Sequence, residues 1–455
     1  MNSFAASYTQ HCLSELTEFL SIPSVSADKN YQAYIERAAD FLVDSLTTAG
    51  LHKAAKHYAD GNAIVYAEKI VDEGLPTVLI YGHYDVQPAD PIELWVTPPF
   101  EPTIKEGKIY ARGACDDKAQ VHLIIKALEL LNKNAALPCN IKVMFEGEEE
   151  TGSGSLMRFV STHQELLAAD VLLVCDTSMP SEDKPTLVTG LRGVAYFELE
   201  VNGAPQDLHS GMLGGAVINP LQVLCNLLSK LKNEQNQICI PGFYDGVQTN
   251  YPSFNMPEIP QHLKAHLSGE KGYTAAELIT VRPTLDINGI TGGYTGDGPK
   301  TIIPAQASAK LSMRLVEGQD HEQISVSLQN FLQSQTPKQV SLTIKKLAGC
   351  NAVTTNTDMP AYQAAKHALE KNFSGEVLNT RIGGSIPVVS FIKDQLHVET
   401  VLMGFGLDND QIHAPNESFS INNYFKGIQT LMDFFENYAF INKPTIYNNT
   451  IAQQL

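Results

Sequence analysis

The chain has 455 residues, a formal net charge of -18 at neutral pH and 43% apolar residues. This length exceeds one ordinary hydrophobic core, so we expect a globular protein of two domains. The acidity argues against nucleic acid and against anionic membrane surfaces as partners. Seven scattered cysteines without a C-x-x-C pair argue against both a disulfide framework and a thiolate zinc site.

The sequence contains no recognisable signal for export or membrane insertion. Residues 1–20 lack the basic start, the long apolar run and the cleavage site of a signal peptide. No apolar run reaches the roughly 18 residues that a transmembrane helix requires. Together with the odd cysteine count, this favours a reducing compartment, and we expect a cytoplasmic protein.

The first part of the chain alternates between helix and strand patterns. Helical spacing predicts helices at 8–20, 34–48, 118–131 and 155–167. Apolar runs predict strands at 63–67, 77–81, 140–145 and 171–175. Strands that alternate with helices are typical of a mainly parallel sheet with helices on its faces.

The pattern changes after a polar, proline-containing segment at 180–186. Longer strands are predicted at 194–201, 307–316 and 340–344, and helices at 220–231 and 321–332. The glycine- and proline-rich segment 241–300 gives few regular signals. The first pattern then returns, with helices at 361–371 and 422–438 and a strand at 399–403.

This order predicts an α/β protein with one domain inserted into another. The mainly parallel sheet and its helices form a catalytic domain split between residues 1–188 and 356–455. Residues 189–355 form an inserted two-layer α+β domain.

Polar side chains gather where the strands of the split domain end. Ligands of open α/β sheets usually bind at the carboxyl ends of the strands. The residues predicted at this edge are His83, Asp85, Asp116, Asp117, Glu148, Glu149, Glu150, Asp176 and His413.

Each of these residues also has a purely structural explanation. Asp116 or Asp117 suits a helix N-cap, the glutamates suit a solvated first helical turn, and His413 suits an ordinary loop. One cause that accounts for all of them is a two-metal hydrolase. Two divalent ions roughly 3.5–4 Å apart need a bridging carboxylate, histidine and carboxylate ligands, and a free carboxylate base. Nitrogen and oxygen ligands without cysteine favour zinc, with manganese and cobalt as alternatives.

Four motifs together resemble a known family. They are Gly-His-Tyr-Asp-Val at 82–86, Arg-Gly-Ala-Cys-Asp-Asp-Lys at 112–118, Glu-Gly-Glu-Glu-Glu-Thr-Gly-Ser at 146–153 and Asp-Leu-His-Ser-Gly at 207–211. The chain resembles the di-zinc metallopeptidases that include aminoacylase, acetylornithine deacetylase, succinyl-diaminopimelate desuccinylase, glutamate carboxypeptidase and carnosinase. Residues 207–215 and 381–387 are most similar to the carnosinase and cytosolic nonspecific dipeptidase branch.

The resemblance implies a ligand set for two metal ions. His83 would bind one ion and His413 the other, and Asp116 would bridge them from a cis peptide bond with the following residue. Glu150 and Asp176 would be the terminal carboxylates, one on each ion.

The resemblance also implies the residues that act beside the metals. Glu149 would be the general base that takes a proton from the bridging water and hands it to the leaving amine. Asp85 would orient the imidazole of His83. Glu148 stands where dipeptidase relatives often carry an apolar residue.

The inserted domain would act as a lid and a dimerisation domain. By resemblance, His209 would reach the active site of the partner subunit in a homodimer and stabilise the oxyanion. Arg314 would pair with the α-carboxylate of the substrate, because a guanidinium binds a carboxylate with two parallel hydrogen bonds. Thr301, Gly384 and Ser385 would bind the C-terminal end of the substrate.

We therefore predict a zinc-dependent dipeptidase that acts on dipeptides or very short peptides. The first alternative is an N-acyl amino acid deacylase or a carboxypeptidase with the same metal site. The second is a relative without metals that acts in binding or regulation, although every ligand and base position carries a competent residue. The third is a single-ion metalloenzyme, which would leave Asp116 or one histidine without a role.

Overall fold

The structure is a computed structural model that describes residues 4–134 and 136–441. The chain divides into two compact units, the first made of Met1–Thr189, Thr355–Asn379 and Phe391–Leu455 and the second of Gly190–Thr354 and Thr380–Ser390. Sequence analysis placed residues 380–390 in the split catalytic domain, whereas their contacts place them in the second unit. Residues 442–455 of the predicted split domain lie outside the described residues.

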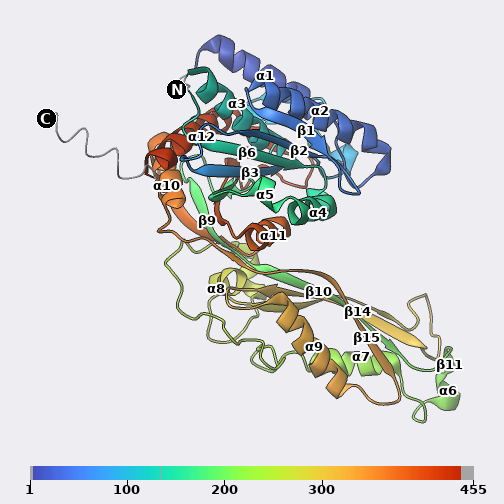
Figure 1. The fold of residues 1–455 in the computed structure, drawn as a ribbon. Helices are drawn as coiled ribbons and strands as arrows, with labels where there is room; N and C mark the ends of the chain where they lie inside the picture. The colour runs from blue at the N-terminus through green and yellow to red at the C-terminus, as the bar shows by residue number, and fades with distance from the viewer. Residues whose placement is uncertain (1–3, 135, 442–455) are drawn as a thin grey trace. The chain divides into compact units, whose positions relative to one another are not determined.

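The first unit is built on a mixed sheet with the strand order β1-β2-β6-β3-β7-β18-β9, and β9 runs on into the second unit, where its last residues pair with β16 (Figure 1). The central strands β6, β3, β7 and β18 are parallel, which confirms the predicted parallel sheet at its centre. The strands on either side pair antiparallel and were not expected to do so. The strands are β1 (His52–His57), β2 (Ile64–Lys69), β3 (Thr77–His83), β6 (Asn140–Glu146), β7 (Val171–Val174), β9 (Thr186–Leu191), β16 (Val353–Thr354) and β18 (Glu399–Met403).

Helices cover both faces of this sheet (Figure 1). Val78 and Ile80 of β3 belong to a core shared with α1, α2, α3, α10 and α12. Leu79 and Tyr81 alternate with them along the strand, so they are buried on the opposite face. A strand covered on both faces has a continuous apolar sequence, as β3 does. The helices are α1 (Ala6–Leu20), α2 (Gln32–Thr48), α3 (Lys118–Asn134), α4 (Gly154–Thr162), α5 (Gln164–Leu167), α10 (Pro360–Asn372) and α12 (Ile421–Ile441).

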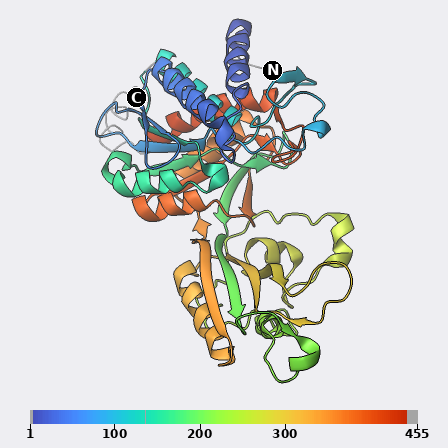
Figure 2. The same ribbon diagram turned by 90° about the vertical axis from the view of Figure 1, so that its right-hand side faces the viewer.

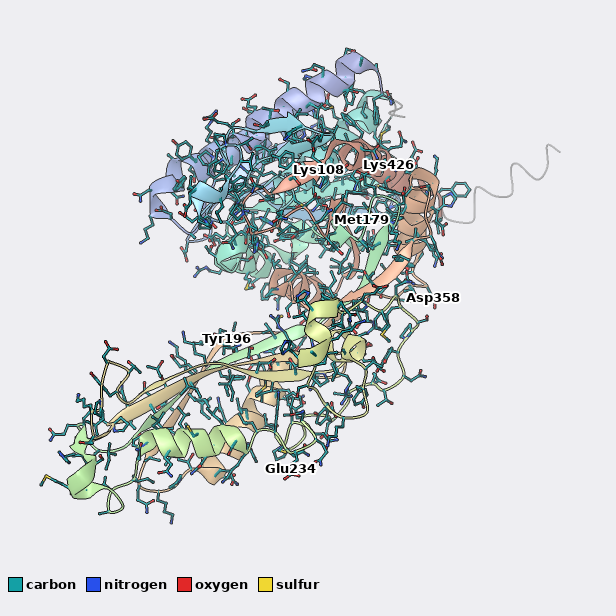
Figure 3. The ribbon with its side chains drawn as sticks, turned by 180° about the vertical axis from the view of Figure 1, so that it is seen from behind. Lys108, Met179, Tyr196, Glu234, Asp358 and Lys426 are labelled. Atoms are coloured by element: carbon teal, nitrogen blue, oxygen red, sulfur yellow. The ribbon has the colours of Figure 1, made fainter. Side chains whose placement is uncertain are left out.

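The second unit is the predicted two-layer α+β arrangement. Its antiparallel sheet has the order β12-β14-β10-β15, and α7 and α9 pack against it (Figure 2). Ala195 and Phe197 of β10 face this core, whereas Tyr196, which lies between them in sequence and is labelled in Figure 3, belongs to the other face of the strand. The elements are α7 (Pro220–Ser229), α9 (His321–Gln335), β10 (Gly193–Asn202), β12 (Thr284–Gly292), β14 (Gln306–Leu315) and β15 (Ser341–Cys350).

Segment 241–300 contains a 3₁₀ helix (Gln261–His266), an α-helix and a strand that the sequence did not predict. A short helix, α8 (Ala275–Thr280), begins with a capping box formed by Thr274 and Glu277. Strand β12 follows at the edge of the second sheet, and its pairing register shifts between Ile287 and Gly289. Because most of β12 is exposed and its register is interrupted, the sequence lacks a clean two-residue alternation.

Across the described part of the chain, no helix combines the length and apolar character needed to cross a membrane.

Candidate metal centre

The carboxyl ends of the parallel strands bring the predicted metal-site residues together. His83 is the last residue of β3, and Asp176 follows two residues after β7. Glu149 begins a 3₁₀ turn (Glu149–Thr151) just after β6. His413 lies in the loop between β19 (Gly406–Leu407) and β20 (Ser418–Ser420), which follows β18. Because the parallel strands end at one edge of the sheet, these distant segments of sequence meet there.

Asp116 lies between the two histidines. Its Oδ1 is 2.9 Å from Nε2 of His83, and its Oδ2 is 2.9 Å from Nε2 of His413. The Asp116–Asp117 peptide bond is cis, as the resemblance implied. His83 is fully buried, whereas the side chain of His413 is 52% exposed. One carboxylate therefore faces two imidazoles from opposite sides, and the site is open to solvent on the side of His413.

Two sets of ligand atoms are each compact enough to hold a cation. Ligand atoms of Asp116, Glu150 and His413 lie within 4.8 Å of one another, and so do those of His83, Asp117 and Asp176.

Asp117 was not among the ligands that the resemblance implied. Its carboxylate accepts a hydrogen bond from the backbone amide of His83 at 3.3 Å, so one of its oxygens already has a partner at the end of β3. The ring of His83 points instead at Asp116, with Asp176 Oδ2 3.8 Å from Nε2. Asp116 therefore belongs to one set and also contacts His83 of the other.

The electrostatics of the site favour bound cations. Burial, followed by the charge of the nearby Asp116 carboxylate, raises the pKa of Asp176 to about 8. Burial also opposes ionisation of Asp116, but hydrogen bonds to His413 and His83 outweigh it and lower its pKa. Contacts with Asp116 and Glu150 raise the pKa of His413 to about 10. Carboxylates this close together are stabilised by protons or imidazolium ions, and a divalent metal ion stabilises them in the same way. The nitrogen and oxygen donors fit zinc, manganese or cobalt.

Glu149 stands beside this donor set without belonging to either half of it. Its carboxylate makes no hydrogen bond with any described residue. Burial raises its pKa to about 7; His83 opposes this shift, and the neighbouring carboxylate of Glu150 reinforces it. A buried carboxylate with free lone pairs and a pKa near neutrality is well suited to accept and return a proton.

Glu148 has a different role from its two neighbours. Its Oε1 accepts a hydrogen bond from the amide of Asn62 at 2.6 Å, and its Oε2 accepts one from the amide of Ser155 at 2.9 Å. Glu148 thus connects the loop before β2 to the first turn of α4, while Glu149 and Glu150 are left for the site.

Asp85 acts mainly on the glutamate turn. Its carboxylate accepts hydrogen bonds from the backbone amides of Glu149 and Glu150 at 3.2 and 3.1 Å. Nδ1 of His83 lies 3.1 Å from the backbone oxygen of Asp85 and 3.4 Å from its carboxylate. The predicted contact with His83 is therefore present, with the backbone oxygen as the nearer partner.

Glu417 organises the loop that carries Asp116, and sequence analysis missed it. Its buried carboxylate accepts hydrogen bonds from the amides of Gly113, Cys115 and Asp116 and from Nη1 of Arg112, at 2.7 to 3.0 Å. Glu417 lies about 300 residues further along the chain. Only its position four residues after His413 could have suggested a role.

The loop that carries His413 is anchored by Asp410. This buried carboxylate accepts hydrogen bonds from Nζ of Lys108 and from the amide of Leu407, at 2.7 and 2.8 Å. Lys108, labelled in Figure 3, lies on β5 (Lys108–Tyr110) beside β20. Charged side chains therefore fix both ends of the His413 loop.

The predicted substrate-binding residues and the predicted catalytic residue His209 lie in the second unit and form two groups. Nη1 of Arg314 donates a hydrogen bond to Oγ of Ser385 at 2.7 Å, and Gly384 precedes this serine. His209 lies on β11 (Leu208–His209), which pairs with the short strand that follows Thr301. The carbonyl of Thr301 accepts a hydrogen bond from the backbone amide of Ser210. Both His209 and Thr301 are exposed.

Comparisons with known proteins agree with this site. A family model described as peptidase family M20/M25/M40 matches residues 79–437. The Cys-Gly metallodipeptidase dug1 of Schizosaccharomyces pombe is 31% identical, over 94% of this chain and 96% of the relative. The human Beta-Ala-His dipeptidase is 32% identical, over 82% of this chain and 76% of the relative.

Solved structures show the same fold. The M20 family metallo-carboxypeptidase Sso-CP2 of Sulfolobus solfataricus has a TM-score of 0.83 at 31% identity, covering 94% of this chain and 99% of its own. Human carnosine dipeptidase 1 has a TM-score of 0.74 at 28% identity, covering 95% and 97%. These matches confirm the predicted hydrolase of the metallopeptidase class. The chain belongs to peptidase family M20/M25/M40.

Proposed function

We propose that this protein is a two-metal dipeptidase that cleaves the peptide bond of unblocked dipeptides. The observation that carries the proposal is Asp116, whose two oxygens each lie 2.9 Å from a different histidine. A single-ion site would need only one of these histidines. The names of the Schizosaccharomyces pombe and human relatives support dipeptides as the substrate class.

Five side chains would hold the ions. His83 and Asp176 suit one ion, His413 and Glu150 suit the other, and Asp116 suits both. Zinc is the metal we favour, because imidazole and carboxylate ligands without thiolate are typical of its catalytic sites. When bound, two divalent ions lower the pKa of the attacking water and polarise the scissile carbonyl.

Glu149 would act as the general base and then as the general acid. It would take a proton from the attacking water and deliver it to the leaving amine. Its free lone pairs and its pKa near 7 support this role, since such a group changes protonation state easily near neutral pH. Asp85 would hold Glu149 in place through the backbone amide of the glutamate turn.

Arg314 and Ser385 would bind the α-carboxylate of the substrate, with Thr301 and Gly384 beside its C-terminal end. The support is local: the guanidinium of Arg314 already contacts the hydroxyl of Ser385. A guanidinium and a hydroxyl are donors that a carboxylate accepts from.

The second unit would also act as a lid and a dimerisation domain, with His209 serving the active site of the partner subunit. Nδ1 of His209 accepts a hydrogen bond from the amide of Gly211 at 3.0 Å. The neutral ring then carries its proton on Nε2, which leaves an exposed donor suited to an oxyanion. The neighbouring Met212 is 79% exposed, as expected of a residue on a contact surface.

We propose a cytoplasmic location. The support is that the structure gives no disulfide to any of the seven cysteines among the residues it describes, as is usual for proteins of a reducing compartment.

A substrate panel tests the proposed function. We expect the metal-replete enzyme to hydrolyse unblocked dipeptides and to leave N-acetylated dipeptides and N-acetyl amino acids intact. The similarity to the Sulfolobus solfataricus metallo-carboxypeptidase makes a carboxypeptidase the second candidate. Cleavage of N-acetylated dipeptides at least as fast as of free ones would favour that candidate, and preference for N-acetyl amino acids would indicate a deacylase.

A further inference from the structure

Arg192 connects three segments of the second unit. It lies between β9 and β10, and its Nε donates a hydrogen bond to the carbonyl of Gly383 at 2.8 Å. Its own backbone amide donates to the carbonyl of Gly384 at 3.1 Å. Its Nη1 donates to the carbonyls of Leu278 and Arg282 at 3.1 and 3.2 Å. One arginine thus holds two consecutive glycine carbonyls against the end of α8.

This role depends on the shape of a guanidinium. The last carbonyls of a helix have no partners within the helix, and a cation is favourable there. The planar group presents donors in several fixed directions, so it can bind the end of α8 and Gly383 together. An ammonium group on a lysine would keep the charge but lose the fixed directions.

The glycine segment is held at close range. A Cβ atom built on Gly383 would lie 2.1 Å from the carbonyl oxygen of Ile279 and 3.0 Å from Nη2 of Arg192. The backbone of Gly383 therefore fits between the end of α8 and the guanidinium only because it has no side chain.

The held segment leads directly to the predicted carboxylate site. Ser385 follows Gly384, and its Oγ accepts a hydrogen bond from Nη1 of Arg314 at 2.7 Å. Burial and then the charge of Arg314 lower the pKa of Arg192 to about 10, while Asp286 opposes this. Arg192 is still charged at neutral pH. Two guanidinium groups therefore repel each other beside Ser385, and an added carboxylate would relieve that repulsion.

We propose that Arg192 is a positioning residue for the α-carboxylate of the substrate. By holding the carbonyls of Gly383 and Gly384, it fixes Ser385 against Arg314 before the substrate arrives. This inference rests on the proposed function, because it takes Arg314 and Ser385 as the carboxylate site. Fixing the site in advance reduces the ordering that binding would otherwise require.

The test compares an unblocked dipeptide with its C-terminal amide, which lacks the carboxylate. Arg192→Gln should raise KM for the free dipeptide about 10- to 100-fold, the range expected for losing hydrogen bonds from a charged donor. Its kcat should change only a few-fold. The ratio of kcat/KM between free dipeptide and amide should fall by a similar factor, and Arg192→Lys should restore part of it.

Two further variants sharpen the result. Arg381→Gln removes an arginine two residues before Gly383 whose guanidinium lies over the ring of Phe254 at 5.7 Å. It should leave the free-to-amide ratio unchanged. Because Arg192 acts through Ser385 and Arg314, the double variant Arg192→Gln/Arg314→Gln should discriminate no worse than Arg314→Gln alone.

Several outcomes would overturn the inference. A wild-type ratio in Arg192→Gln would remove its positioning role and leave the proposed function intact. Equal losses on both substrates, with a lower melting temperature, would show a purely structural arginine. If the wild type cleaves only N-acetyl amino acids, the ratio of kcat/KM is measured between these substrates and their C-terminal amides. A fall of this ratio in Arg192→Gln then supports the positioning role, and an unchanged ratio overturns it. If the wild type cleaves no substrate with a free carboxylate, the proposed function and the inference both fail.

Discussion

Three consecutive glutamates after β6 have three different environments. The carboxylate of Glu148 accepts from two backbone amides, that of Glu150 faces His413, and that of Glu149 makes no hydrogen bond with a described residue. The difference arises from the 3₁₀ turn that begins at Glu149 and is held by the carboxylate of Asp85. At the residue scale, a single step along the chain separates a structural carboxylate from the proposed base, and the proposed base from a proposed metal ligand.

Glu149→Gln should keep both metal ions and lower turnover about 10²–10⁴-fold, the usual contribution of a general base. The amide keeps the shape of the side chain but cannot accept the proton. Turnover and metal content, counted by elemental mass spectrometry, would be measured on one preparation. Glu148→Gln is the matched control, since it should lower stability more than turnover. Near-normal activity of Glu149→Gln would remove Glu149 as the base.

Glu146 should make stability depend on pH. Burial, followed by the charge of Asp85, raises the pKa of its carboxyl to about 8. The folded state therefore holds a proton that the unfolded state releases between about pH 4.5 and pH 8. The contribution of the protonated Glu146 to the free energy of unfolding is complete below that window. It decreases by up to about 1.4 kcal/mol per pH unit as the pH rises through the window.

Glu146→Gln has no proton to lose, so its stability should increase relative to wild type across this window and then stay level. The measurement is urea unfolding of both proteins at several pH values and one fixed metal concentration. The hydroxyls of Tyr81 and Ser153, which donate to Glu146, have an acceptor in the amide as well. Parallel stability curves for the two proteins would contradict the assignment.

At the scale of elements, the loop between β5 and α3 depends on Glu417. This carboxylate accepts hydrogen bonds from the backbone amides of Gly113, Cys115 and Asp116 itself, and it pairs with the buried Arg112. Glu417→Gln should weaken metal binding about 10- to 100-fold, as is usual when a residue that orients a ligand is lost.

The same variant should lose about 3–5 kcal/mol of stability because Arg112 stays buried without its partner. Metal affinity would be followed by competition with a chelator, and stability by denaturant unfolding. Glu399→Gln, which breaks an exposed ion pair with Lys393, is the control and should change neither. Wild-type metal affinity in Glu417→Gln would show that the loop holds Asp116 without it.

The sequence predicted elements with strong periodicity and missed elements whose stability comes from distant partners. Helix α3 and strand β3 were predicted because their apolar patterns are long and uninterrupted. The predicted helix at 155–167 is divided between α4 and α5 at His163. Strand β12 was missed because its register shifts at an exposed edge.

Likewise, the ligand set follows a motif, but Glu417 and Arg192 do not. Their importance comes from backbone carbonyls and amides that are remote in sequence. No local pattern of residue types records such contacts.

At the scale of the whole molecule, the proposed dimer gives each active site residues from two chains. His209→Ala should keep its metals and lower turnover about 10²–10³-fold, as expected when one oxyanion donor is lost. Mixing it with Glu149→Gln should produce dimers in which one site has both residues intact. Such mixtures should regain activity, up to one site per mixed dimer. If subunit exchange is verified and no activity returns, His209 does not act across subunits.

The central claim is that two ions per chain support hydrolysis of dipeptides. The most direct measurement removes all metal with a chelator and then titrates zinc back, while bound metal and hydrolysis of an unblocked dipeptide are followed together. The account predicts no activity without metal and full activity at two ions per chain, in line with the two ligand sets that Asp116 joins. Full activity in the demetallated protein, or a plateau at one ion per chain, would contradict it.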